Sequence, residues 1–381
     1  MQHSLIYFPD YAHANPYQAM LYASIDGAFS TRPGTIVDAL DALGRADWPQ
    51  RAIFHLHWED AIYRHLPNAD AALQECQRFL ERSEQFLEDG GLFVWTIHNR
   101  APHDGRFLEV HEELCAKLAV LALQIHVHSY SAAAELARDR RLDHSKLAVI
   151  PHGNYAPLFP LRRIPPRTAQ GPRRFLLFGR LGRYKGSDEL VRAFLALRDP
   201  RAELVIAGKQ IDPIDLSAVP PSVAPRITTE NRFLDETEIP KLFASVDFVV
   251  APYVASLTSG TLMLAMSLGR PVIAPRLPTL AELIADGENG LLFDPDQEAG
   301  LAAALARACE IEASRLQRLS EAAFNTAMRY DWRMIGSLWS GLLYRLVARP
   351  QVHRAISLAR SGPSVSLSPG SPESDGRWHP A

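Results

Sequence analysis

The chain of 381 residues has only three cysteines, Cys76, Cys115 and Cys309, and they are far apart. An odd number of widely spaced cysteines excludes a disulfide framework and fits a reducing compartment. The sequence also lacks the HExxH or paired-cysteine spacing of a zinc site, so we expect no metal and no cofactor. No run of about 18 uninterrupted apolar residues occurs, which argues against a transmembrane helix.

The net charge is small, −3 at pH 7 from 40 basic and 43 acidic side chains. This balance gives no reason to expect nucleic acid as a partner. The opening residues, MQHSLIYFPDYAHANPY, have no charged region followed by a long apolar run, so we expect no signal peptide. A cytoplasmic protein is therefore expected, with attachment to the inner face of the plasma membrane left open.

Apolar runs alternate with helical patterns along most of the chain, which predicts an α/β protein with parallel sheets covered on both faces. The composition changes at Pro157–Arg174, which is rich in proline and arginine and has no periodicity, as in an interdomain linker. We expect doubly wound, Rossmann-like domains over residues 1–160 and 172–330. The expected strands are Leu5–Phe8, Ala52–His57, Leu92–His98, Ile125–His128, Leu147–Ile150, Phe175–Gly179, Ala202–Ala207, Phe248–Ala251, Pro271–Ala274 and Gly290–Phe293.

Two further segments follow the second domain. Residues 331–348 have the spacing of an amphipathic helix, which we expect to pack back across the first domain. Residues 350–381 are rich in serine, proline and glycine and are expected to be disordered.

The segment Phe175–Gly186, FLLFGRLGRYKG, predicts a binding site for a phosphorylated ligand. An apolar strand ends at Gly179, and a helix begins after Gly186. Backbone N–H groups and the helix dipole favour an anion at such a turn. Arg180 and Lys185 have the charge to neutralise a diphosphate without a metal ion. An ordinary turn with solvated cations is the alternative.

A second turn lies on the expected same edge of the same sheet. The strand DFVVAP leads to the loop Thr258–Thr261, and a buried helix follows. Ser259 and Thr261 offer hydroxyl groups, and Gly260 allows a ligand to approach the backbone closely. A simple N-cap would use the same residues. The convergence of two turns at one edge favours a ligand site.

Glu282 lies just beyond the strand that ends at Ala274, where a carboxylate can accept hydrogen bonds from ribose or sugar hydroxyls. A surface glutamate is the alternative. The sequence Asp294-Pro295-Asp296 has the spacing of a metal-binding DxD motif, but proline and aspartate after a strand are typical of a turn.

GRLGRYKG, the SGT loop and GRPVIAP…ELIADGENGLLFDPD resemble the donor-binding domain of GT-B-type glycosyltransferases. The resemblance implies a sugar nucleotide in the C-terminal domain, an acceptor in the N-terminal domain and catalysis in the cleft, usually without metal. It assigns Arg180 and Lys185 to the donor diphosphate. Retaining enzymes of this layout have two glutamates eight positions apart, whereas this chain has Ser256 and Leu264, which disfavours a retaining mechanism.

The N-terminal half resembles the xanthan-type glycolipid β-mannosyltransferases. The resemblance depends on Asn15-Pro16-Tyr17, His55–Asp60, His98–Asp104 and His152–Tyr155, which occur together in order. It implies GDP-mannose as donor, a polyprenyl-diphosphate-linked oligosaccharide as acceptor, and inversion of the anomeric centre. This set covers about 340 residues, nearly all of the chain except the tail.

Inverting transfer needs a base for the acceptor hydroxyl, and the ends of parallel strands face the ligand crevice. Asp60 and Asp104 are the first candidates for this base, and His98 is the next or contacts the donor sugar. His57, Glu59 and Asn15 are expected on the acceptor side, and His152 beside donor or acceptor. Each of these residues could instead cap a loop.

One helix-like stretch has an apolar side that admits two interpretations, a membrane-facing surface or a buried core face. Its apolar residues are Phe107, Leu108, Val110, Leu114, Leu118 and Leu121.

The leading hypothesis is thus a glycosyltransferase that moves mannose from GDP-mannose, with inversion, in exopolysaccharide biosynthesis. The alternatives are a retaining hexosyltransferase that uses a UDP-sugar, a sugar-nucleotide epimerase of the same fold, and a non-catalytic donor-binding subunit.

Overall fold

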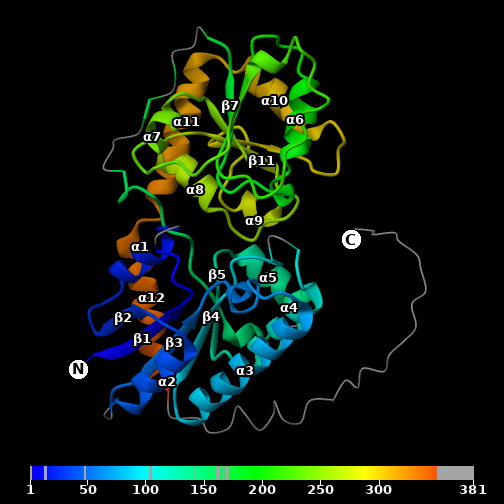
Figure 1. The fold of residues 1–381 in the computed structure, drawn as a ribbon. Helices are drawn as coiled ribbons and strands as arrows, with labels where there is room; N and C mark the ends of the chain where they lie inside the picture. Colours follow the sequence, from blue (N-terminus) through cyan, green and yellow to red (C-terminus); the bar gives the residue numbers. More distant parts are fainter. Residues whose placement is uncertain are drawn as a thin grey trace.

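The structure is a computed structural model that describes residues 2–12, 15–46, 49–102, 105–140, 142–159, 164–165, 167 and 171–349. Asp104 and residues 350–381, for which the sequence made predictions, lie outside the described residues. Figure 1 shows two α/β domains stacked end to end, each built around its own sheet. Within the described residues, none of the helices is long and apolar enough to span a bilayer.

The N-terminal domain contains a six-stranded parallel sheet of order β2-β1-β3-β4-β5-β6. Its central strands β3 and β4 are buried at every position, as expected when helices cover both faces. The strands are β1 (His3–Phe8), β2 (Phe29–Pro33), β3 (Ala52–Leu56), β4 (Leu92–Thr96), β5 (Gln124–Val127) and β6 (Leu147–Val149).

The helices of this domain begin with the caps that their sequences provide. Thr35 and Asp38 form a reciprocal capping box at α2, and Ser129 caps α5. The helices are α1 (Tyr17–Ser24), α2 (Ile36–Gly44), α3 (Ala69–Glu88), α4 (Leu108–Leu121) and α5 (Tyr130–Asp139), with a short 3₁₀ turn η1 (Glu59–Ile62) after β3. On α4, Val110, Leu114, Leu118 and Leu121 are buried, which favours the core interpretation of that apolar side.

The C-terminal domain has a second parallel sheet of order β12-β11-β10-β7-β8-β9. Two doubly wound parallel sheets confirm the predicted α/β architecture. The strands are β7 (Arg174–Phe178), β8 (Glu203–Ala207), β9 (Ile227–Glu230), β10 (Phe248–Val250), β11 (Val272–Pro275) and β12 (Gly290–Phe293). The helices are α6 (Ser187–Leu195), α7 (Ile239–Ala244), α8 (Gly260–Ser267), α9 (Pro278–Ala281), α10 (Gly300–Glu310), α11 (Ala313–Met328) and α12 (Trp332–Val347).

The last helix, α12, crosses from the C-terminal domain and packs against α1 of the N-terminal domain (Figure 1). Its residue Gly336 lies against the backbone of α1, where an added Cβ would lie 2.0 Å from the carbonyl oxygen of Ser24. The indole of Trp332 donates a hydrogen bond to the carbonyl of Asn154 at 2.6 Å. Trp339 is fully buried against His55 and His126. The helix therefore connects the C-terminal domain to the sheet that carries the N-terminal part of the site.

Candidate active site

The strand order of the C-terminal domain reverses between β7 and β10, so the loops after these strands open into one crevice. Gly179, directly after β7, has φ +111°, a conformation that side chains other than glycine rarely adopt. Its neighbour Gly208, after β8, lies so close that an added Cβ would be 1.8 Å from the Gly179 carbonyl oxygen. Because these two glycines have no side chains, the bottom of the crevice is formed by backbone atoms and stays open.

Lys185 is the central charged group of this crevice, and only 7% of it is exposed. Its Nζ donates to Tyr253 Oη at 3.1 Å and to Thr261 Oγ1 at 3.3 Å. The Cβ position of Gly179 is 3.6 Å from the same Nζ. Among the described residues, no carboxylate forms an ion pair with this ammonium group. A buried cation without an anion is costly, so the site favours an anionic ligand.

The Lys185 charge perturbs the hydroxyl beside it. Burial alone would raise the pKa of Tyr253, but the adjacent ammonium group outweighs burial and holds that pKa below its ordinary value. Burial likewise acts to lower the pKa of Lys185, and the oxygens of Tyr253 and Tyr184 outweigh it, so the lysine pKa is raised. Lys185 is therefore positively charged at neutral pH.

The SGT loop completes this side of the crevice. Ser259 caps α8 by accepting a hydrogen bond from the amide of Leu262 at 3.2 Å, and its hydroxyl also lies 3.0 Å from Tyr253 Oη. An added Cβ on Gly260 would lie 2.8 Å from Tyr155 Oη, so glycine permits this close approach. Thr261 reaches Lys185, as described above. The capping and ligand-binding interpretations of this loop are therefore compatible.

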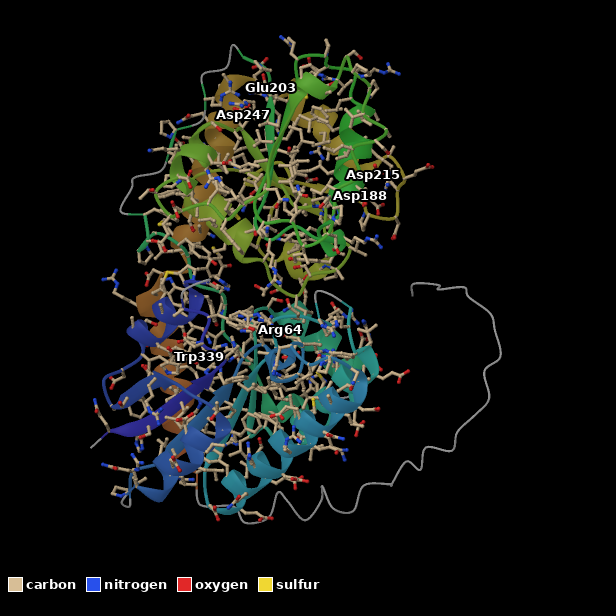
Figure 2. The ribbon with its side chains drawn as sticks, in the orientation of Figure 1. Arg64, Asp188, Glu203, Asp215, Asp247 and Trp339 are labelled. Atoms are coloured by element: carbon tan, nitrogen blue, oxygen red, sulfur yellow. The ribbon has the colours of Figure 1, made fainter. Side chains whose placement is uncertain are left out.

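Arg180, the other predicted cation, is exposed, and within the described part of the chain its guanidinium has no hydrogen-bond or ion-pair partner. Across the cleft, burial raises the pKa of Tyr11, and the positive charges of Arg64 and, more weakly, Arg180 oppose that rise. Tyr11 follows β1 and lies under the guanidinium of Arg64 at 5.1 Å from ring centroid to carbon. Figure 2 labels Arg64 at the edge of the N-terminal domain that faces the other domain.

Asp60 lies in η1 at this same edge, with 15% of its side chain exposed, and pairs with Arg64 at 3.5 Å. Asn15 lies just before α1, and its Oδ1 accepts a hydrogen bond from the amide of Tyr17 at 3.1 Å. The strand order of the N-terminal sheet reverses between β1 and β3, so these loops share the crevice of that domain. Asp60 thus stays a candidate for the base, and Asn15 stays a candidate for the acceptor side.

Glu59 points the other way. It is buried, and its Oε2 accepts a hydrogen bond from the indole of Trp95 at 3.2 Å. Burial raises the pKa of Glu59 to about 7. Sequence reasoning placed it on the acceptor side because it follows a strand, whereas its surroundings in the structure are the interior behind η1.

Glu59, His111 and Cys115 form a buried cluster whose ligand atoms all lie within 4.8 Å of one another. Burial lowers the pKa of His111 to about 4, and the imidazole Nδ1 lies 2.9 Å from Tyr63 Oη. The three groups have the donor types of a metal site. Arg140 already places a positive charge beside Glu59 and Cys115, which opposes a second cation there.

The histidines at the strand ends gather in one buried layer below the cleft. His57 Nδ1 lies 3.0 Å from His98 Nε2, and the indole of Trp58 stacks on His98 with ring centroids 4.1 Å apart. Burial lowers the pKa of His57 and His98 well below the ordinary value. These imidazoles are therefore neutral at pH 7. Protonating them would destabilise the folded protein.

His152 connects the histidine layer to the SGT loop. Its Nδ1 is 2.7 Å from the carbonyl oxygen of Gly153, and its Nε2 is 3.7 Å from the Cβ position of Gly260. Burial lowers its pKa to about 4. A cavity between the domains is lined by His152 together with His128, Thr258, Ser259 and Glu282.

Glu282 accepts hydrogen bonds from the backbone amides of Tyr130, at 3.1 Å, and Ser131 at the start of α5. Its carboxylate thus joins the two domains through a helix N-terminus, a favourable place for a negative charge. The fold brings Gly179, Lys185, Ser259, Gly260 and Thr261 into one crevice and places His152 and Glu282 beside it.

Several participants were missed by sequence reasoning. Tyr253 and Tyr22 contact Lys185 and the histidine layer respectively, and Thr96 joins two histidines. Tyr253 is two residues beyond Ala251, the end of a predicted strand, and that position is a usable signal. Tyr22 lies within a helix, and nothing in the local pattern distinguishes it from a core residue.

Residues 172–310 match the family model described as "Glycosyl transferases group 1". The GDP-mannose:glycolipid 4-beta-D-mannosyltransferase of Xanthomonas campestris pv. campestris is 29% identical over 285 residues, which are 74% of this chain and 76% of that protein. A D-inositol 3-phosphate glycosyltransferase of Corynebacterium glutamicum is 31% identical over 183 residues, 46% of this chain and 44% of that protein.

Two solved structures share the fold. HepE of Anabaena in complex with UDP and glucose has a TM-score of 0.63 at 15% identity, covering 91% of this chain and 100% of that one. Sucrose-phosphate synthase from Thermosynechococcus elongatus has a TM-score of 0.64 at 17% identity, covering 91% and 98%. The C-terminal domain is thus a group 1 glycosyltransferase domain, and the chain is a glycosyltransferase with the GT-B fold.

Proposed function

We propose that this enzyme transfers mannose from GDP-mannose, with inversion, to an oligosaccharide on a polyprenyl diphosphate in exopolysaccharide biosynthesis. The observation that carries the donor assignment is the buried Lys185 ammonium, which has only hydroxyl partners among the residues that the structure describes and lies between the starts of two helices. The relative from Xanthomonas, named for GDP-mannose and a glycolipid, supports the choice of sugar nucleotide and acceptor.

Lys185 and Arg180 supply the positive charge that a departing diphosphate needs, and we propose that transfer requires no metal ion. In the reaction, a base removes the proton of the acceptor hydroxyl, and the oxygen attacks the anomeric carbon. The bond from that carbon to the diphosphate breaks, and GDP leaves with the electron pair. Activity that disappears with EDTA and returns with Mg²⁺ would contradict the metal-independent part.

The inverting assignment is supported by the two positions where retaining relatives have glutamates. Ser256 donates its hydroxyl to the carbonyl of Thr258 at 2.9 Å, and Leu264 is buried in the core. Neither offers a carboxylate to the donor. Asp60 follows β3 at the crevice edge of the N-terminal domain, where it pairs with Arg64, and we assign it as the base.

Calorimetric titration with GDP, UDP, GDP-mannose and UDP-glucose tests the donor. We expect binding of the guanine nucleotides only. A preference for UDP would favour the retaining UDP-sugar enzyme, and no binding of any nucleotide would contradict a donor site altogether. Transfer of labelled mannose to a lipid extract, followed by NMR of the anomeric proton, then separates an inverting transferase from an epimerase and from a non-catalytic subunit.

Replacing the proposed base tests its role separately from donor binding. We expect Asp60→Asn to lower kcat by about a hundredfold or more while leaving GDP affinity intact, since general bases contribute about 10²–10⁴ in rate. Asp41→Asn, an exposed carboxylate on α2, is the matched control and should retain full activity. Full activity of Asp60→Asn would place the base elsewhere, with Asp104 as the next candidate.

A further inference from the structure

A continuous chain of hydrogen bonds runs through the buried histidine layer. It begins at the carbonyl oxygen of Ile150, which lies 2.8 Å from His126 Nε2. The next links are His126 Nδ1 to Thr96 Oγ1 at 3.0 Å and Thr96 Oγ1 to His55 Nε2 at 2.7 Å. Tyr22 Oη then joins His55 Nδ1, at 2.9 Å, to His57 Nε2, at 2.6 Å.

The chain continues from His57 Nδ1 to His98 Nε2 at 3.0 Å, and from His98 Nδ1 to His128 Nε2 at 3.4 Å. It ends at His128 Nδ1, a buried nitrogen that forms no hydrogen bond within the described part of the chain. His128 lines the cavity between the domains, opposite the SGT loop.

The first link sets the direction of every other link. A carbonyl oxygen can only accept, so His126 carries its proton on Nε2, and its Nδ1 accepts from the hydroxyl of Thr96. That hydroxyl oxygen accepts from His55 Nε2, and the same alternation passes through Tyr22, His57 and His98. His128 is therefore protonated on Nε2 and has a lone pair on Nδ1.

A second carbonyl fixes a second imidazole in the opposite tautomer. His152 Nδ1 donates to the carbonyl of Gly153, so its Nε2 is an acceptor and lies beside Gly260. The rings of His128 and His152 have centroids 5.6 Å apart. The cavity wall thus has two neutral acceptors side by side.

Because the chain of hydrogen bonds ends at the carbonyl of Ile150, it cannot carry a proton away from the site. A proton taken up at His128 could leave the far end of the chain only by passing from His126 to the amide oxygen of Ile150, which is a very weak base. The chain therefore orients imidazoles and is not a route for removing a proton from the site.

We propose that His128 Nδ1 and His152 Nε2 accept hydrogen bonds from two hydroxyl groups of the transferred hexose, and that the chain from Ile150 is what holds His128 in this accepting form. The inference rests on the proposed function, since it takes the cavity beside the SGT loop to be the place of the donor sugar. A site built from acceptors discriminates strongly against a ligand that lacks the matching hydroxyl, because buried acceptors are then left unpaired.

The tautomers are measurable without any ligand, by long-range ¹H–¹⁵N correlation on the full-length protein, with signals assigned from His128→Gln and His152→Gln. We expect His128 protonated on Nε2 and His152 on Nδ1. A chain running in reverse, with His128 protonated on Nδ1, would overturn the inference whatever the enzyme binds.

Thr96 allows the chain to be cut at a distance from the cavity, because it is fully buried between β4 and its neighbours. Thr96→Val removes the hydroxyl with little change in shape, and we expect a mixture of tautomers at His128. The affinity for GDP-mannose should fall about tenfold, while the affinity for GDP stays constant. Thr96→Ser retains the hydroxyl and should restore both readouts.

His128→Phe removes the acceptor directly and provides a second test if Thr96→Val fails to fold. This variant should lower the affinity for GDP-mannose about tenfold and leave the affinity for GDP unchanged. Equal losses for GDP and GDP-mannose, or no loss for either, would overturn the proposed sugar contact. Failure of the wild type to bind any nucleotide would instead contradict the proposed function, and the tautomers would still decide the orientation of the chain.

Discussion

The two domains share a doubly wound sheet but line the cleft with different chemistry. Twelve of the 14 histidines lie between His3 and His152, and the other two, His353 and His379, follow the C-terminal domain. The crevice of the C-terminal domain instead contains the buried Lys185 and the exposed Arg180. One side thus provides positive charge for an anion, and the other provides neutral hydrogen-bonding rings. The same crevice geometry supports both kinds of lining, because the ends of the strands determine where the lining residues lie but not which residue types they are.

Removing the buried cation should have the largest effect. We expect Lys185→Ala to weaken the affinity for GDP at least about thirtyfold, since a desolvated charge contact is worth about 2–5 kcal/mol on truncation. Arg183→Ala, an exposed cation two residues away, is the matched control and should bind normally. Isothermal titration calorimetry measures both. An unchanged affinity for Lys185→Ala would remove the diphosphate assignment.

Lowering the pH should destabilise the N-terminal domain more than the C-terminal domain. In the unfolded chain histidines titrate near 6.5, whereas burial lowers the pKa of His126 and His152 to about 4. Their neutral forms therefore stabilise the fold above pH 6.5, and this stability is lost as the pH falls toward 4. At pH 5.5, one unit below 6.5, each such histidine lowers the free energy of unfolding by about 1.4 kcal/mol.

Hydrogen exchange at pH 7, 6 and 5 resolves this difference by domain. Protection should fall first in β3, β4 and β5, while β7, β10 and β11 serve as the internal reference because their domain contains no histidine between residues 172 and 349. An equal loss in both sheets would contradict the assignment of the effect to the histidine layer.

The connection through α12 can be tested with two glycines of that one helix. Gly336→Ala would place a methyl group 2.0 Å from the carbonyl oxygen of Ser24 and should destabilise the protein by about 2 kcal/mol. At Gly341 an added Cβ would contact only the end of the Arg345 side chain, at 3.5 Å, so Gly341→Ala should stabilise the helix by up to about 1 kcal/mol. Urea denaturation of the two variants measures the contrast, and equal effects would contradict the close approach of α12 to α1.

The smallest expected effect concerns the contact between Glu282 and α5. Glu282→Gln removes the negative charge at the helix start, which is worth about 0.3–1 kcal/mol at a surface. We expect faster amide exchange at Tyr130 and Ser131 and little change elsewhere. Glu288→Gln, which replaces another carboxylate of the same domain, should leave both amides unaffected. Unchanged exchange in Glu282→Gln would indicate that the contact does not hold the domains together.

Local patterns predicted ten of the strands because their residues form mostly apolar runs, and this holds even for the edge strands β6 and β12, with sequences LAV and GLLF. The two that were missed, β2 and β9, lie at the edges of their sheets, and their sequences FSTRP and ITTE are largely polar and partly exposed. An edge strand has one partner and an open side, so burial leaves a weaker pattern in its sequence.

The features of the site also fall into two groups, those that local sequence patterns predicted and those that they did not. Gly179, Lys185 and the SGT loop are close in the chain to strand ends and helix starts, and the sequence alone determined that this segment could hold an anion. Tyr253 as the partner of Lys185, Glu59 turned into the interior, and Glu282 bonded to α5 were decided only by the tertiary structure. The physical reason is that strand and helix patterns are local, whereas the direction of a side chain and the tautomer of an imidazole depend on partners distant in the chain.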